Sequence, residues 1–398
     1  EFVLGSICIS NENNVYITGS FSDKILFTNN DSIMPTGGFD TFIASYSKEG
    51  DFLWGRNVAY GPSNQRSTGI IIDSENNLLL TGFFNNEVDF GTQSFTSNGA
   101  NDAYILKLDR NGNYLSSKEV DALNSNIRIF DIAATDAGYY FSGIYSDSVS
   151  FDIDTLISVS STLDVYLYRT NLALEGQWVN NFSGAGLEYC YSIDVDNDGN
   201  VFLGGYSNST NLNIDSLDAS LTKNLIGGYD AYVTNYSSDG TLNWFRNYGW
   251  ISDDQLFDIK EFDDQLYITG LFSDELIWNE DTLRSNGVND NSMFIGNIDP
   301  QTGARLKSHS LNGQENYQER GRNVLITDEG VYSLLAYASD SLMVGDNTFY
   351  NNSPGTLKTI IAQLGCLPIT LNTQTSTPLP CNTLNGGDSA QISLSAEG

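Results

Sequence analysis

The sequence predicts an all-β protein, a β-propeller with six blades of four strands and an extra hairpin in each blade. Three observations predict this fold: a strand-like segment recurs about every 62 residues, each period holds four apolar segments of alternating polarity, and turns rich in Asn, Asp and Gly join them. Units of this size cannot bury their own faces, so radial packing of several units supplies the missing contacts. Seven blades is the alternative.

The period is clearest in a segment that ends in glycine. It reads NVYITG in the first copy and NLLLTG in the second, and a sixth copy, VYSLLAY, has Leu335 in place of glycine. The glycines of the other five copies are Gly19, Gly82, Gly143, Gly205 and Gly270. A longer passage, GGFDTFIASYSKEGDFLW at 37–54, returns as GGYDAYVTNYSSDGTLNW at 227–244, three periods later.

The second copy shows the elements in order. The first strand, TGIIID at 68–73, is followed by the turn SENN and the second strand, NLLLTGFF at 77–84. The extra hairpin follows at 87–99, and the third strand is DAYILKLD at 102–109. After the turn RNGN, the fourth strand is YLSSKEV at 114–120.

Beyond the repeats, Cys366 and Cys381 bracket a Thr- and Pro-rich loop. A disulfide between them would stabilise the loop by about 3 kcal/mol and favours an extracellular protein. The three expected parts are the propeller at 1–365, a disulfide-closed linker at 366–381, and the start of a following Ig-like repeat or linker at 382–398.

The charge balance excludes two classes of partner. There are 18 Lys and Arg residues against 50 Asp and Glu residues, which gives a net charge of −32. Such a surface repels phosphate backbones and anionic lipid, so we expect neither nucleic-acid binding nor membrane insertion. No apolar run is long enough to span a bilayer. The remaining cysteines, Cys8 and Cys190, lie in apolar runs and are expected to be buried thiols.

The turn in VDNDGNVFLGG and the strands GGYDAYV and DGTLNW resemble the bacterial SBBP-type propeller repeats, over nearly all of 1–365. The resemblance implies a propeller module of secreted and surface proteins, many of them large adhesin-like chains of Bacteroidota. It implies no fixed activity, because propellers carry enzymes, lectins and scaffolds alike. The tail CNTLNGGDSAQISLSAEG is similar to the opening of the Ig-like repeats in gliding-motility adhesins of that group.

Catalytic motifs are missing from the sequence. The one histidine, His309, lies on an expected outer strand, and the spacing patterns of hydrolases, zinc enzymes and nucleotide-binding loops do not occur. We therefore expect no enzyme, but a binding or display module for a glycan or protein in a large cell-surface adhesin. The alternatives are a carbohydrate-active enzyme that uses acidic residues around the channel, and a purely structural cap of a surface fibre.

Loops between blades surround one mouth of a propeller channel, where ligands generally bind. The candidate ligand-binding residues in these loops are Trp250, Tyr317, Tyr189 and Asp254. In contrast, Trp54, Trp178 and Trp244 recur in register on the fourth strand, which predicts packing between blades.

Acidic residues at turns have two interpretations. Asp194, Asp196 and Asp198 alternate before Gly199, as in the first half of a calcium-binding loop, but the downstream Glu is missing. A hairpin turn held by side-chain to backbone hydrogen bonds is the simpler reading, and calcium is the only cofactor we consider. Asp residues that open the third strand are expected to be turn caps, namely Asp40, Asp102, Asp164 and Asp230.

Pairs of Asp with Ser or Thr, followed by an aliphatic residue, resemble the O-glycosylation signal of Bacteroidota. Several fall on the extra hairpin, and ordinary turn formation is an equal alternative. The hydroxyl residues concerned are Ser32, Ser148, Thr155, Ser216, Thr282 and Ser341.

Overall fold

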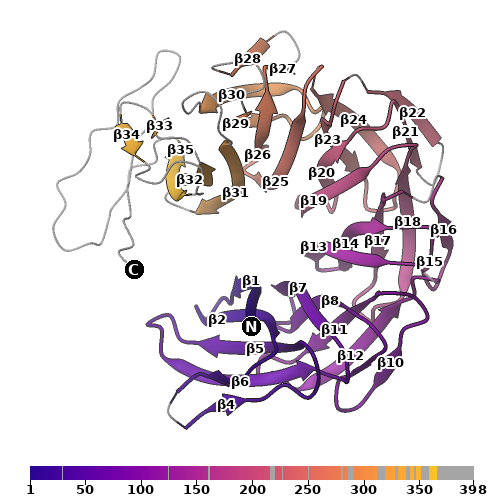
Figure 1. Cartoon of the computed structure of the whole chain (residues 1–398). Coiled ribbons are helices and arrows are strands. Elements are labelled where there is room, and N and C mark those ends of the chain that lie inside the picture. Colours follow the sequence, from indigo (N-terminus) through magenta and orange to yellow (C-terminus); the bar gives the residue numbers. More distant parts are fainter. Residues whose placement is uncertain are drawn as a thin grey trace. The chain divides into compact units, whose positions relative to one another are not determined.

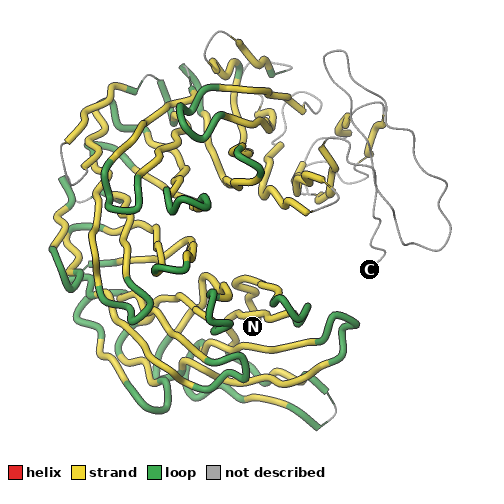
Figure 2. Tube along the Cα trace, turned by 180° about the vertical axis from the view of Figure 1, so that it is seen from behind, coloured by secondary structure: helices red, strands yellow, loops and turns green. Residues whose placement is uncertain are grey.

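The computed structural model confirms the all-β class (Figure 2). It describes residues 1–364 except 29, 124, 160–161, 216–219, 226, 250, 279–280, 286–290, 312–318, 328–329, 338–340, 345–346 and 351–357. Within that part of the chain the elements are strands and turns without a helix, and hence without a helix that could cross a membrane.

Antiparallel sheets repeat along the chain as predicted. We number the repeats 1 to 6 and call the strands of each sheet first to fourth, in the order in which they follow one another along the chain (Figure 1). The first strands are β1 (Phe2–Ile9), β7 (Gln65–Ile72), β13 (Ile127–Thr135), β19 (Glu188–Val195), β25 (Asp254–Phe262) and β31 (Glu319–Thr327). The second strands are β2 (Val15–Phe21), β8 (Leu78–Phe84), β14 (Gly138–Tyr145), β20 (Val201–Ser207), β26 (Gln265–Ser273) and β32 (Gly330–Tyr337).

The outer half of each sheet follows. The third strands are β5 (Asp40–Tyr46), β11 (Asp102–Leu108), β17 (Asp164–Thr170), β23 (Asp230–Tyr236), β29 (Asn291–Ile298) and β35 (Lys358–Leu364). The fourth strands are β6 (Phe52–Ala59), β12 (Tyr114–Val120), β18 (Gly176–Ser183), β24 (Leu242–Tyr248) and β30 (Arg305–Leu311). Each consecutive pair of strands in a sheet is antiparallel, so every repeat is a simple meander interrupted by one insertion.

The insertion is the predicted extra hairpin between the second and third strands. The hairpins are β3 (Ile25–Leu26) with β4 (Ser32–Ile33), β9 (Glu87–Asp89) with β10 (Ser94–Thr96), β15 (Ser148–Ser150) with β16 (Thr155–Ile157), β21 (Asn211–Asp215) with β22 (Ser220–Asn224), β27 (Glu275–Trp278) with β28 (Asp281–Arg284), and β33 (Ser341–Val344) with β34 (Asn347–Tyr350). One of them, β21–β22, continues the sheet of the preceding repeat beyond β18.

The chain forms two compact units. Unit 1 comprises Glu1–Val195, Asn211–Lys223 and Ser238–Thr241. Unit 2 comprises Asp196–Thr210, Asn224–Ser237 and Leu242–Gly398. The expected number of blades stays a prediction, and the expected domain boundaries after 365 and 381 lie outside the described residues.

Aromatic and branched side chains fill the space between successive sheets. In unit 1 one core joins Ile105 of β11, Ile129 of β13 and Tyr166 of β17, all of which are buried. In unit 2 a second core joins Val233 of β23 and Phe294 of β29. Both faces of these third strands are covered, so every residue of β11 and β23 is buried.

The recurrent Trp packs on a turn of the next repeat, which confirms its predicted role between blades. In unit 1, Trp178 of β18 donates its Nε1 hydrogen to the carbonyl oxygen of Ser238 at 3.0 Å. Its ring lies against Gly240, which has φ +92°, so that a Cβ there would come within 2.9 Å of the indole. Only glycine combines this backbone with such a close approach. Two further pairs, Trp54 with Gly112 and Trp244 with Gly303, repeat the contact.

At the junction between repeats 2 and 3, both the Trp and the glycine are replaced by other residues. On β12 the position of the Trp is Ser116, which pairs with Lys107 as Trp178 pairs with Arg169. In the facing turn of repeat 3 the glycine is replaced by Leu174, which has φ 64° and is buried. A leucine in the left-handed region is strained. Its side chain compensates by filling volume that an indole occupies at the other junctions.

We predict that Trp178→Ala lowers the free energy of unfolding by about 3–5 kcal/mol, because it removes a buried indole and leaves a cavity between two repeats. Urea denaturation followed by circular dichroism measures the change. The control is Leu115→Ala on the fourth strand of repeat 2, where the side chain is exposed and the cost should stay below about 0.5 kcal/mol. Equal effects of the two variants would contradict the packing role of Trp178.

A double-mutant cycle tests whether the partners depend on each other. Gly240→Leu alone should destabilise strongly, because the new side chain meets the Trp178 ring. Combined with Trp178→Ser, the same leucine copies the Ser116 and Leu174 pair and should recover part of the loss, measured by the same denaturation. Additive losses would show that the two positions act independently.

Candidate functional site

The first strands of unit 1 lie side by side along one edge of their sheets (Figure 1). Strand β13 contacts β7 on one side and β19 on the other. The Asp131 carboxylate accepts a hydrogen bond from the Ile193 amide at 2.8 Å, and this bond fixes β19 against β13. Side chains at equivalent positions of these strands therefore become neighbours.

An aromatic group forms at one such position. The ladder of β13 with β14 skips Phe130, which leaves this residue in a β-bulge at the fourth position of the strand. The fourth residue of β19 is Tyr191, whose ring stacks on Phe130 with centroids 5.8 Å apart and an interplanar angle of 17°. Tyr189 lies 6.3 Å from Tyr191, and all three side chains are partly exposed.

Two arginines occupy the second positions of the neighbouring strands. Arg66 of β7 places its guanidinium carbon 3.9 Å from the centre of the Phe39 ring. Arg128 of β13 lies 4.9 Å from the centre of the Phe83 ring, and its side chain is exposed. Tyr189 has the equivalent position on β19. We call Arg66, Arg128, Phe130, Tyr189 and Tyr191 the inner-strand patch.

In unit 2 the equivalent aromatic residue is buried. Phe257, the bulge residue of β25, is only 7% exposed. Arg322 of β31 lies over its ring at 5.1 Å, and Tyr206 packs against it edge-on. An aromatic side chain at a bulge can therefore be buried by its neighbours. Phe130 and Tyr191 differ, because their side chains are partly exposed.

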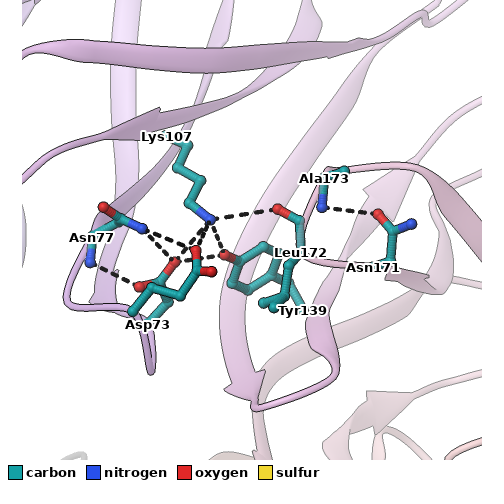
Figure 3. A network of polar contacts seen from close by, with 8 residues as sticks. Asp73, Asn77, Lys107, Tyr139, Asn171, Leu172 and Ala173 are labelled. Atoms are coloured by element: carbon teal, nitrogen blue, oxygen red, sulfur yellow. Dashed lines mark hydrogen bonds and ion pairs between the residues drawn. The ribbon is translucent and has the colours of Figure 1, made fainter.

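A buried group of ionisable side chains lies elsewhere in unit 1 (Figure 3). Lys107 of β11 is 8% exposed and lies 3.1 Å from the Asp73 carboxylate and 2.8 Å from the Tyr139 hydroxyl, to which it donates. Tyr139 of β14 donates to Asp73 at 2.6 Å, and Lys107 also reaches the carbonyl oxygen of Leu172 at 3.4 Å. These contacts hold repeats 2 and 3 together at the junction that lacks the Trp.

The protonation states of this group are fixed. Burial would raise the pKa of Asp73, but hydrogen bonds from Tyr139, Asn77 and Lys107 outweigh it and lower that pKa. Burial would lower the pKa of Lys107, but its bonds with Tyr139 and Asp73 outweigh it and raise that pKa. Burial and then the bond to Asp73 raise the pKa of Tyr139 to about 12. None of the three exchanges a proton near neutrality, so the group is structural.

One carboxyl group does titrate near neutrality. Glu119 of β12 pairs with Tyr104 in the ladder, and its Oε1 atom has no hydrogen-bond partner among the described residues. Burial, and then the neighbouring carboxylates of Asp102 and Asp121, raise the pKa of Glu119 to about 7. The equivalent positions in three other repeats are Asn57, Asn181 and Asn247.

The structure describes two of the four predicted ligand-binding residues, Tyr189 and Asp254. Trp250 and Tyr317 lie outside the described residues. The assignment of Asp254 is wrong, because this residue begins strand β25 and its side chain is 0% exposed. Tyr189 lies on β19 rather than in a loop, yet the fold brings it into the inner-strand patch. The sequence prediction did not include its neighbours Phe130 and Tyr191, although an alignment of the repeats places these two residues at the same position.

The described residues contain no group of three acidic, His or Cys side chains that could hold a metal, and calcium binding at this turn stays a prediction. Asp196 instead caps its own turn. Its Oδ1 atom accepts from the amides of Asp198 at 3.0 Å and Asn200 at 2.8 Å, and its Oδ2 atom accepts from the Asn200 side chain at 2.7 Å. Asp194 lies on strand β19.

Two of the third-strand aspartates, Asp40 and Asp102, are turn caps, as predicted. Asp40 accepts a hydrogen bond from the Thr36 amide at 2.7 Å, and Asp102 accepts from the Asn98 amide at 3.2 Å. His309 is exposed on β30, also as predicted. Cys190 is buried, and burial raises its pKa to about 12, whereas Cys8 is only partly buried. The proposed pair Cys366 and Cys381 lies outside the described residues.

The glycosylation candidates that the structure describes all lie on the extra hairpins, where the sequence placed several of them. Ser32 and Thr155 are exposed, and Ser148 and Thr282 are partly exposed. Ser341 is a correction, because it is only 9% exposed and a buried hydroxyl does not accept a glycan in the folded protein. Ser216 lies outside the described residues. Modification at the exposed positions stays a prediction.

Comparison with known proteins defines the class. Residues 179–213 match the SBBP family, which is described as a β-propeller repeat. A WD repeat-containing protein of Acanthamoeba polyphaga mimivirus, L264, which is uncharacterized, is 31% identical over 128 residues, or 28% of this chain and 9% of that protein. The chain has the fold of a β-propeller, and residues 179–213 are similar to one of its repeats.

Solved structures of similar architecture include enzymes. A polysaccharide lyase of family PL25, an ulvan lyase, has a TM-score of 0.43 at 10% identity, over 88% of this chain and 79% of that chain. The quinohemoprotein alcohol dehydrogenase of Comamonas testosteroni has a TM-score of 0.40 at 10% identity, over 96% of this chain and 62% of that chain. The expectation that the chain is not an enzyme is corrected by these neighbours. At this level of similarity they assign no reaction to this chain.

We predict that Glu119→Gln stabilises the protein at pH 8 by on the order of 1 kcal/mol, after allowance for solvent screening. A raised carboxyl pKa means that the stability Glu119 contributes is complete below about pH 4.5 and is lost as the pH rises through about 7. The glutamine stays neutral and can donate to Asp102, as Asn57 donates to Asp40 at 2.7 Å. Thermal melting at pH 4.5 and pH 8 measures the effect.

The gain should appear at pH 8 and vanish at pH 4.5. The matched control is Glu49→Gln, which removes one charge from an exposed turn and should change neither melting temperature. A gain of equal size at both values of pH would contradict the assignment of the titrating group.

Proposed function

We propose that this propeller is the ligand-binding module of a larger extracellular protein, a cell-surface adhesin of the Bacteroidota type, and that it binds a glycan at the inner-strand patch. The observation that carries the proposal is the partly exposed stack of Phe130 on Tyr191, with Tyr189 beside it. Many other large aromatic side chains, such as Tyr104 and Tyr166, are fully buried in the cores.

The chemistry of the patch suits a sugar ring. One face of a pyranose presents C–H groups, and these pack on an aromatic ring with little loss of entropy because Phe and Tyr side chains have few rotatable bonds. Tyrosine hydroxyls and guanidinium groups at the edge can then bond the ring hydroxyls of the sugar. A few polar groups around an apolar floor are typical of small-ligand sites.

Glycan cleavage is the second candidate, and Glu119 favours it. A carboxyl group with a pKa of about 7 is protonated in part at neutral pH, which is the property of a general acid in glycoside hydrolysis. Two further carboxyl groups, on Asp102 and Asp121, lie close enough to raise that pKa. Product release from a bound polysaccharide that stops in Glu119→Gln would establish this function.

We predict that a polysaccharide and glycan array detects binding by the wild-type protein and that Tyr191→Ala weakens it at least tenfold, because one side of the stacking surface is lost. Phe130→Ala should have a similar effect, since the two rings form one surface. Isothermal titration calorimetry with the best array ligand measures the change.

The control variant is Phe262→Ala, which removes an exposed aromatic ring at the far end of β25 and should leave the affinity unchanged. Circular dichroism verifies that each variant is folded. Undiminished binding by a folded Tyr191→Ala protein would move the site elsewhere, and binding to no glycan would refute the proposal.

A further inference from the structure

We infer that the glycan bound at the inner-strand patch carries an anionic group, a carboxylate or a sulfate, and that Arg66 and Arg128 bind it. The inference rests on the proposed function, since it names the class of ligand that the patch selects. It starts from a feature that these two arginines share, since each lies over a phenylalanine ring and neither has an acidic partner among the described residues.

Neither guanidinium is paired with an acidic group of the residues that the structure describes. The chain has 50 Asp and Glu residues for 18 Lys and Arg residues, so a carboxylate partner is easily found. Some cations of the chain have one, since Lys118 pairs with Asp152 at 2.7 Å and Arg110 with Glu12 at 2.8 Å. Among the described residues, Arg66 and Arg128 form no ion pair and their guanidinium groups donate no hydrogen bond. They contact phenylalanine rings instead.

The ring contacts leave the donors of these groups available. A guanidinium carbon placed over an aromatic ring keeps the planar N–H edge directed away from the ring, toward whatever lies beside it. The stem is held and its conformational entropy is already reduced, so less is lost when an oxyanion binds bidentately. This is the arrangement of a prepared anion site rather than of a solvated surface side chain.

The fold brings the two arginines together around one ring. Phe83 of β8 is the cross-strand neighbour of Arg66 in the ladder with β7. The same ring lies under Arg128 of β13. Strands β7 and β13 are in contact, and the aromatic members of the patch continue on β13 and β19. A ligand that stacks on Phe130 and Tyr191 therefore has the guanidinium pair along its edge.

The net charge of −32 restricts the ligand further. A dense polyanion would be repelled by the rest of the surface at moderate ionic strength. A polymer with acidic groups separated by uncharged sugar rings avoids most of that repulsion, and its neutral rings can stack on the aromatic residues. We therefore expect acidic polysaccharides of mixed composition rather than fully charged ones.

The test measures affinity for matched acidic and neutral oligosaccharides by isothermal titration calorimetry. The carboxylate probe is a hyaluronan hexasaccharide with its carboxyl-reduced form, and the sulfate probe is a κ-carrageenan hexasaccharide with its desulfated form. We expect at least one acidic probe to bind about tenfold or more tightly than its neutral form. Arg128→Gln should remove that difference and leave the affinity for the neutral form unchanged.

Two controls separate this inference from the proposed function. Arg110→Gln removes a positive charge outside the patch and should preserve the preference for the acidic probe. Tyr191→Ala should weaken acidic and neutral probes alike. Equal affinities for acidic and neutral forms, or equal losses for both in Arg128→Gln, would overturn the anion site while the glycan site stands. Binding to neither form of either probe would overturn both.

Discussion

The structure depends on the contact between a fourth-strand side chain of one repeat and the turn of the next. A single sheet of four strands exposes two apolar faces, and each repeat is stable only because a neighbour covers them. The indole of Trp178 satisfies this need in two ways, since its ring fills the space above Gly240 while its N–H bonds the carbonyl oxygen of Ser238. This contact holds neighbouring sheets side by side. Their first strands are therefore adjacent, and the inner-strand patch forms along them.

Turn chemistry explains part of the acidic composition. Carboxylates such as Asp73, Asp109 and Asp196 accept backbone amides of the residues two or four positions later and so replace the hydrogen bonds that a tight hairpin lacks. A repeat protein with many hairpins accumulates such residues. Part of the negative charge is therefore a consequence of the turns that the fold requires.

Much of the fold could be predicted from the sequence, because the repeat copies reinforce one another. The period, the extra hairpin and the packing role of Trp54, Trp178 and Trp244 each rest on several copies. Sites are harder, since a site is where one copy departs from the others. Asp254 looked like a loop residue because the start of β25 is not marked in the sequence. Glu119 and Phe130 gain their significance from neighbours that only the strand register identifies.

The hairpin β21–β22 follows β20 in the chain but covers the edge of the sheet of repeat 3. Strand β18 ends at Ser183, and its outer edge is covered by β21 through Phe182 with Ile214 and Ser183 with Asn213. During synthesis on the ribosome, this edge remains uncovered until about thirty further residues have emerged. An open edge strand pairs readily with other chains. The edge of β18 can therefore pair with another chain until β21 has emerged and covered it.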